Sequence, residues 1–306
     1  MCQHSAGQHG AHNHSHAPAD YGRAFAIGVA LNAAFVVGEV VYGLQAHSLA
    51  LVADAGHNLS DVGGLLLSWG AFVLARRGAS ARFTYGLRRA SILSALFNAL
   101  LLFVGLGGVA WEAAHRFAHA EPVAGKIVMA VSAVGILVNT TVALLFMRGR
   151  EHDLNIKSAF SHMAADAVIS LGVLIAGAVI LFTHWLWLDP AVSLVIVGVI
   201  LWGTWSLFKD ALALSLDAVP NGIDPAAVRV YLETAPGVSG VHDLHIWAVS
   251  TTEAALTAHL AVPAGSDWHA VTERVSGELH DKFGIEHATL QLEPAGTMHD
   301  CPLQAA

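Results

Sequence analysis

The sequence predicts an α-helical membrane protein with six transmembrane helices and a small cytoplasmic α+β domain of ferredoxin-like type at its C-terminal end. Its 306 residues are 55% hydrophobic and 12% charged, whereas soluble domains carry about 25% charged residues. The apolar residues lie in long runs, as a bilayer requires. After Lys209 the composition of the chain becomes acidic, with 13 Asp and Glu against three Lys and Arg. The acidic end of the chain therefore forms a separate domain outside the bilayer.

Six apolar runs each reach the length of about 20 residues that a spanning helix needs. They extend over residues 22–45, 48–75, 87–111, 123–147, 158–183 and 186–208. An even number of spans places both termini on one side of the membrane. Ten Lys and Arg flank the spans on that side, against only Arg116 and Lys126 on the other. Because cytoplasmic loops are enriched in basic residues, we expect a multi-pass protein of the cytoplasmic (inner) membrane with both termini cytoplasmic.

The first twenty residues contain five histidines and no apolar run, so they do not form a cleaved signal peptide. We expect a disordered cytoplasmic tail over residues 1–20. Its histidines are typical of metal-binding low-complexity segments, and a passive tail is the alternative. Cys2 and Cys301 lie in polar segments at opposite ends, which argues against a disulfide framework. The histidines of this tract are His4, His9, His12, His14 and His16.

The acidic domain shows a mixed pattern of helices and strands. A helix is expected over 224–234, strands in "VHDLHIWAVS" and "ALTAHLAVP", a helix over 268–283 and a strand in "ATLQLE". This order favours a ferredoxin-like domain. A domain of fewer than about 100 residues buries little core, which favours pairing with a second copy. The expected divisions are a tail at 1–20, a six-helix transmembrane domain at 21–209, the small domain at 215–294 and a flexible tail at 295–306.

Two of the apolar runs carry ionisable residues in the same spacing. In "VADAGHNLSD" His57 precedes Asp61 by four residues, and in "SHMAADAV" His162 precedes Asp166 by four. Residues four apart share one face of a helix. A single such residue would be read as a satisfied hydrogen bond within the helix bundle. Two matched pairs indicate a functional site, because each ionisable group in a bilayer costs a few kcal/mol or more.

The four side chains supply two imidazole nitrogens and two carboxylate oxygens, which suits tetrahedral Zn²⁺. Mg²⁺ and Ca²⁺ prefer more ligands, mostly oxygen, whereas Cd²⁺, Co²⁺ and Fe²⁺ remain open as cargo. Asp61 and Asp166 lie about 22 and 14 Å from the cytoplasmic helix ends at 1.5 Å per residue, near the midplane where carriers hold substrate. Histidine titrates near neutral pH, so protons compete with the metal. This chemistry favours exchange of metal for protons.

Four segments carry a resemblance to a known family: "SLALVADAGHNLSDVGGL", "FTYGLRRASILSALFNALLLF", "SAFSHMAADAVISLGVLIAG" and "HDLHIWAVS". They resemble the cation diffusion facilitator family, in its zinc-exporting bacterial type, and the likeness covers nearly the whole chain. The resemblance implies a homodimer, six membrane helices per protomer, a cytoplasmic metal-binding domain and export of divalent metal in exchange for protons. It implies that His57, Asp61, His162 and Asp166 are the transport ligands. His57 resembles the zinc-preferring version of the motif, since some members carry Asp there.

The resemblance also points to weaker candidates in the C-terminal domain, with surface histidines as the alternative. Gln291 stands where some relatives have a histidine. In "ARRGASARFTYGLRR", the loop where some relatives have a second metal site, arginines are poor ligands, so we expect no metal there. The candidate ligands are His242, His259, His269, His287 and Glu293.

The sequence therefore predicts a proton-coupled antiporter that exports Zn²⁺, with Zn²⁺ also as a regulatory ion, and not an enzyme with a catalytic cofactor. Its expected partners are divalent cations, protons, the bilayer and a second copy, and no nucleic acid. A membrane metal sensor without transport remains an alternative. An intramembrane zinc hydrolase is disfavoured, because a catalytic zinc keeps an open position and "HNLSD" lacks the Glu of an HExxH motif.

Overall fold

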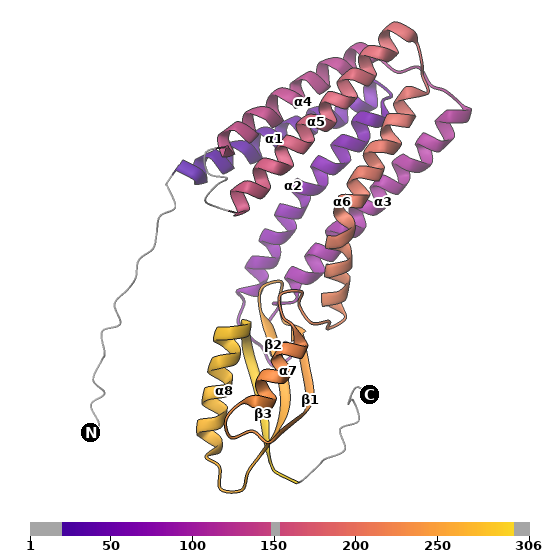
Figure 1. Ribbon diagram of the computed structural model, residues 1–306. Helices are drawn as coiled ribbons and strands as arrows, with labels where there is room; N and C mark the ends of the chain where they lie inside the picture. The colour runs from indigo at the N-terminus through magenta and orange to yellow at the C-terminus, as the bar shows by residue number, and fades with distance from the viewer. Residues whose placement is uncertain (1–19, 148–153, 297–306) are drawn as a thin grey trace. The chain divides into compact units, whose positions relative to one another are not determined.

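The computed structural model describes residues 20–147 and 154–296 (Figure 1). Six long helices precede a small domain of two helices and three strands, which confirms the predicted fold class. The helices of the first part are α1 (Asp20–Gln45), α2 (Leu49–Ala75), α3 (Ala90–Ala118), α4 (Gly125–Phe146), α5 (Leu154–Thr183) and α6 (Leu188–Ser215). The small domain consists of α7 (Pro225–Thr234), β1 (Gly240–Ala248), β2 (Ala254–Val262), α8 (Trp268–Phe283) and β3 (Ile285–Pro294).

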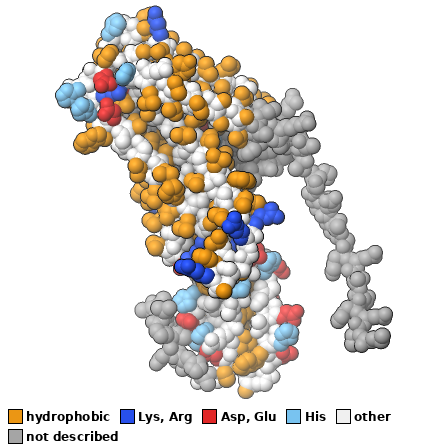
Figure 2. Space-filling view, turned by 180° about the vertical axis from the view of Figure 1, so that it is seen from behind, with side chains coloured by type: hydrophobic (Ala, Val, Ile, Leu, Met, Phe, Trp, Pro, Cys, Tyr) orange, Lys and Arg blue, Asp and Glu red, His pale blue; other side chains and the backbone are white. Residues whose placement is uncertain are grey.

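The first six helices are those of a membrane protein. Within the described residues, α2 to α6 are each long and apolar enough to cross a bilayer, and α1 contributes the shorter apolar stretch Val29–Gln45. Large hydrophobic side chains face outward along these helices, among them Trp202 at 87% and Phe182 at 81% exposure. Figure 2 shows hydrophobic side chains spread over the face of the helical part that this view presents. Soluble monomers rarely expose apolar patches of this extent, so the chain is a multi-pass membrane protein.

The chain forms two compact units. Helices α1, α4 and α5 make up one, and α2, α3, α6 and the small domain make up the other. In the first unit α4 and α5 pack closely where Gly125 faces Gly177. A Cβ atom added at Gly125 would lie 2.9 Å from the Gly177 carbonyl oxygen. Small residues at such crossings let membrane helices approach, which fixes the position of α5 against α4.

In the second unit, α6 holds the start of α2. The Asp189 carboxylate, 1% exposed, accepts the backbone N–H of Leu49 at 2.8 Å and that of Ala50 at 3.4 Å. The first N–H groups of a helix have no partner within the helix, and a carboxylate there is favoured by the helix dipole. Asp189 therefore acts as the N-cap of α2 from another helix, so α2 and its polar residues are anchored to α6.

The small domain is a three-stranded sheet in the order β1-β2-β3, in which β1 and β2 are antiparallel and β2 and β3 parallel. Helix α7 contacts β1, α8 contacts β3, and the two helices contact each other, so both cover one face of the sheet. Asp224 and Asp267 cap the two helices by accepting the backbone N–H of Ala226 and Ala270. The core between the layers consists of fully buried side chains, among them Val228, Leu232, Leu256, Leu260, Val275 and Leu279.

Two helices run further than the apolar runs that predicted them. Helix α3 ends at Ala118 and α6 at Ser215, seven residues beyond the predicted ends at 111 and 208. Backbone hydrogen bonding continues outside hydrocarbon, and polar side chains support it there. On α3 the added turns carry Glu112 and Arg116, one helical turn apart, with Arg116 Nε 3.1 Å from Glu112 Oε1. Hydropathy therefore located the spans and underestimated the lengths of these helices.

Candidate metal sites

Helix α2 presents the first predicted pair of ligands on one face. His57 Nε2 lies 3.7 Å from Asp61 Oδ2, with the side chains 14% and 33% exposed. The distance follows from the helix, because residues four apart stand one above the other. Asp54 and Asn58 of the same helix are buried, at 1% and 0% exposure. A polar strip thus runs along an otherwise apolar span.

Helix α5 repeats the arrangement. His162 Nε2 lies 3.6 Å from Asp166 Oδ2, with the His162 side chain 39% exposed and the Asp166 side chain 1% exposed. Both pairs thus place a nitrogen and a carboxylate oxygen close enough to bind one cation together. Helix α2 belongs to one compact unit and α5 to the other. Within each of the two helices, the structure therefore brings the histidine and the aspartate of the pair together.

Three residues of the small domain form a second group, one from each strand. His242 on β1 pairs in register with His259 on β2, and Glu293 lies on β3. Glu293 Oε2 is 3.4 Å from His242 Nε2, and Glu293 Oε1 is 3.3 Å from His259 Nδ1. Each residue offers one ligand atom, and these three atoms lie within 4.8 Å of one another. Two imidazoles and a carboxylate suit Zn²⁺. The group therefore fits a metal ion.

A residue that the sequence analysis did not select joins this group. Asp243 lies in a bulge of β1, where the register with β2 shifts between His242 and His245, and its φ is 51°. Its Oδ2 lies 3.6 Å from His259 Nε2, and its Oδ1 lies 3.1 Å from His245 Nε2. In a regular strand, adjacent side chains point to opposite faces. The bulge lets Asp243 approach the same imidazole as Glu293.

The other two candidate ligands of the C-terminal domain, His269 and His287, lie outside this group. His269 is exposed at the start of α8, and His287 is exposed on β3, where its ring meets that of Tyr85 edge to face at 5.7 Å. Neither belongs to the three-residue group. Gln291 instead supports that group, since its Nε2 donates to Glu293 Oε1 at 2.8 Å. The N-terminal histidines and the two cysteines lie outside the described residues.

Two side chains on the helices of the small domain have raised pKa values. The contact with Asp281 and the charge of Glu286 raise the pKa of the His280 imidazole. Burial, followed by the charge of Glu278, raises the pKa of Tyr231 to about 12. His280 lies on α8 and Tyr231 on α7, in the helical layer of the domain.

Comparison with known proteins identifies the family. The family model described as "Cation efflux transmembrane domain" matches residues 25–214, and that described as "Cation efflux protein, cytoplasmic domain" matches residues 220–295. The chain belongs to the cation diffusion facilitator family. The members of this family are transporters and not enzymes. The resemblance inferred from the sequence motifs is thereby confirmed.

Two members of this family and one solved domain structure illustrate the similarity. The "Metal cation efflux system protein CzcD" of Cupriavidus metallidurans is 35% identical, over 93% of this chain and 90% of the relative. The "Zinc transporter ZitB" of Escherichia coli strain K12 is also 35% identical, over 92% and 91%. A solved structure, the metal-bound C-terminal domain of the CzcD transporter from Cupriavidus metallidurans, is 38% identical, with a TM-score of 0.23, over 23% of this chain and 99% of that one.

Proposed function

We propose that this cation diffusion facilitator exports Zn²⁺ from the cytoplasm in exchange for protons, through one membrane site made of His57, Asp61, His162 and Asp166. One observation carries the proposal. Two membrane helices each hold a histidine one turn before an aspartate, with nitrogen-to-oxygen distances of 3.7 and 3.6 Å. Each pair alone leaves a cation half coordinated, and the two pairs together complete a tetrahedron.

The ligand chemistry favours zinc as the cargo. Imidazole and carboxylate ligands in a four-coordinate shell suit Zn²⁺, which has no geometric preference of its own from d electrons. The two carboxylates neutralise the double charge of the ion, which lowers the cost of holding it away from water. Cd²⁺, Co²⁺ and Fe²⁺ can occupy the same shell. The zinc transporter and the metal cation efflux protein among the relatives support this cargo class.

Proton exchange follows from the same ligands. A metal binds histidine only when the imidazole nitrogen is deprotonated, and histidine titrates near neutral pH. Protons and the metal ion therefore compete for the same ligand atoms, so protons that enter from outside displace the ion from the site. Outward movement of Zn²⁺ against an inside-negative potential costs about 2.3 kcal/mol per charge per 100 mV, which inward protons offset. A relative named as a cadmium, cobalt and zinc/H(+)-K(+) antiporter supports exchange as the mode.

The proposed orientation places both termini in the cytoplasm of a bacterial inner membrane. The distribution of Lys and Arg among the loops carries this part of the proposal. We further propose a homodimer in which Zn²⁺ at His242, His259 and Glu293 reduces repulsion between two acidic C-terminal domains. The three ligand atoms within 4.8 Å support the site. The excess of acidic residues after Lys209 supplies the charge that the ion would offset.

A metal sensor that signals through the C-terminal domain is the rival function, and a flux measurement separates the two. The full-length protein is reconstituted into vesicles with an acidic lumen, with the C-terminal domain facing outward. We expect external Zn²⁺ to accumulate in the lumen and the accumulation to stop when a protonophore collapses the pH gradient, because proton exit drives zinc entry. A zinc-sensitive dye inside the vesicles records the uptake. Binding without uptake would exclude transport and favour the sensor.

A further inference from the structure

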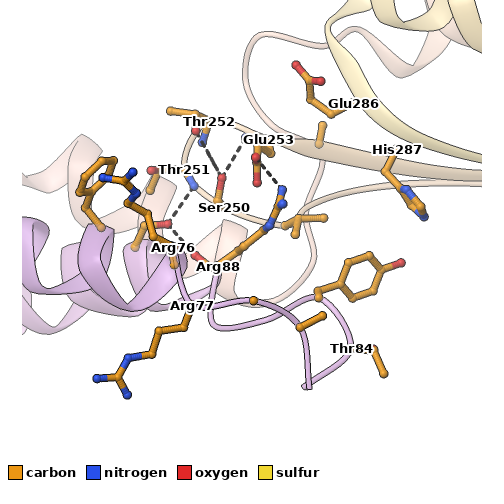
Figure 3. Close-up of a pocket in the computed structure, with 18 of the residues that line it drawn as sticks. Arg76, Arg77, Thr84, Arg88, Ser250, Thr251, Thr252, Glu253, Glu286 and His287 are labelled. Atoms are coloured by element: carbon orange, nitrogen blue, oxygen red, sulfur yellow. Dashed lines mark hydrogen bonds and ion pairs between the residues drawn. The ribbon is translucent and has the colours of Figure 1, made fainter. Parts of the chain in front are cut away.

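A cavity of about 1180 Å³ lies where the end of α2 and the beginning of α3 meet the turn between β1 and β2 (Figure 3). Arg88, two residues before α3, points to the turn and pairs with Glu253 at 2.6 Å. Beside it the Ser91 hydroxyl oxygen accepts the backbone N–H of Thr251 at 3.1 Å. These two contacts join the residues around the beginning of α3 to the turn between β1 and β2 of the C-terminal domain. All of these residues belong to the same compact unit.

Two further cations line this cavity without a matching carboxylate. Arg76 and Arg77 directly follow the last residue of α2, and neither has an ion-pair partner among the residues that the structure describes. The Arg76 guanidinium lies 5.5 Å from the centroid of the Phe72 ring, and Arg77 extends away from the Arg88 pair in Figure 3. The nearby Glu286 is engaged by His280, with Nε2 to Oε2 at 3.5 Å. The rim of the cavity formed by the end of α2 is therefore positively charged.

The same rim adjoins an apolar surface. Trp69, Phe72 and Val73 of α2 are 68%, 58% and 43% exposed, immediately before the two arginines. Figure 2 shows Lys and Arg side chains gathered at the lower border of the hydrophobic surface. Aromatic and basic side chains occupy the level of the lipid headgroups in membrane proteins. The site thus offers a cationic part for a phosphate and an apolar part for hydrocarbon.

We propose that this cavity binds an anionic phospholipid, with the headgroup at the rim that carries Arg76 and Arg77 and the acyl chains along Trp69 and Phe72. Basic pockets beside membrane helices recognise anionic headgroups, and each basic side chain there attracts the headgroup by its charge. The bound headgroup also faces the turn that carries Glu253. An anionic lipid there would join the membrane span to the C-terminal domain. The proposal does not depend on the metal that the protein carries.

The test measures lipid binding to the full-length protein in detergent by native mass spectrometry. Phosphatidylglycerol is the anionic probe, and phosphatidylcholine is the control without net charge. We expect Arg76→Gln with Arg77→Gln to weaken phosphatidylglycerol binding about 30-fold, since each basic side chain contributes about 1 kcal/mol near a membrane surface. Phosphatidylcholine binding should not change. Arg76→Lys with Arg77→Lys, which keeps both charges, should stay within about threefold of the parent protein.

A charge-matched control removes two arginines that do not line the cavity, Arg82 and Arg229. Replacing both by Gln should leave phosphatidylglycerol binding unchanged. Equal losses in the two double variants would overturn the site, because they would show a general effect of net charge. Displacement of the lipid by millimolar inorganic phosphate would overturn the choice of lipid and identify a site for free phosphate. Unchanged binding in the Arg76 and Arg77 variant would also contradict the proposal.

Discussion

Replacing Asp166 by alanine is expected to abolish zinc uptake by vesicles that contain the protein. Asp166 is 1% exposed, and its carboxylate lies 3.6 Å from His162. The change removes one of four proposed ligands and half of the negative charge that balances the ion. Loss of one partner from a buried charge pair costs about 3–5 kcal/mol, so transport should fall by about 100-fold or more. Initial rates of Zn²⁺ uptake under a fixed pH gradient measure the effect.

The control is a second buried aspartate with a different role. Asp189 is also 1% exposed, but its oxygens accept the N–H groups of Leu49 and Ala50. Asp189→Asn keeps an oxygen acceptor for Leu49, so uptake should remain within a few-fold of the parent protein. Retention of zinc by the C-terminal group would show that the Asp166→Ala protein is folded. Normal zinc uptake by the Asp166→Ala variant would show that Asp166 is not a ligand of the transport site.

Replacing His259 by alanine is expected to remove one zinc ion per protomer from the C-terminal domain while zinc uptake continues. His259 occupies the centre of the group, with Nδ1 3.3 Å from Glu293 and Nε2 3.6 Å from Asp243. Its loss leaves His242 and two carboxylates without the imidazole between them. Equilibrium dialysis with Zn²⁺, followed by metal analysis of the full-length protein, measures the bound ions.

The matched control for this prediction is His287→Ala, because His287 is also a histidine of the sheet but is exposed and lies outside the group. The control variant should keep the full zinc content. Equal zinc contents of the parent protein and the His259→Ala variant would show that the three-residue group binds no zinc under these conditions. Loss of uptake in the His259→Ala variant would make the C-terminal site essential for transport.

The features that the sequence predicted depend on local periodicity. Apolar runs located the spans, and the four-residue spacing placed His57 beside Asp61 and His162 beside Asp166, because both members of each pair lie on one helix. The spacing of apolar residues likewise predicted the order of helices and strands in the C-terminal domain. These predictions required no knowledge of distant contacts.

The features that escaped the sequence depend on contacts between distant segments. Asp243 joins the C-terminal group through a bulge and a positive φ. The sequence pattern of "VHDLHIW" predicts a regular strand without a bulge. Asp189 caps α2 from 140 residues away. The sequence suggested five C-terminal ligands, and only the register of three strands singled out His242, His259 and Glu293.

We propose that the pairs on α2 and α5 share one ion, and counting the bound zinc ions distinguishes one shared site from two separate sites. In a Glu293→Gln background, which disables the C-terminal group, the His57→Ala/Asp61→Ala and His162→Ala/Asp166→Ala variants are compared with the combination of all four changes. A shared site predicts that either double variant loses the same single zinc ion per protomer and that the combination loses no more. Separate loss of one ion by each pair, or retention of the ion when all four are replaced, would contradict it.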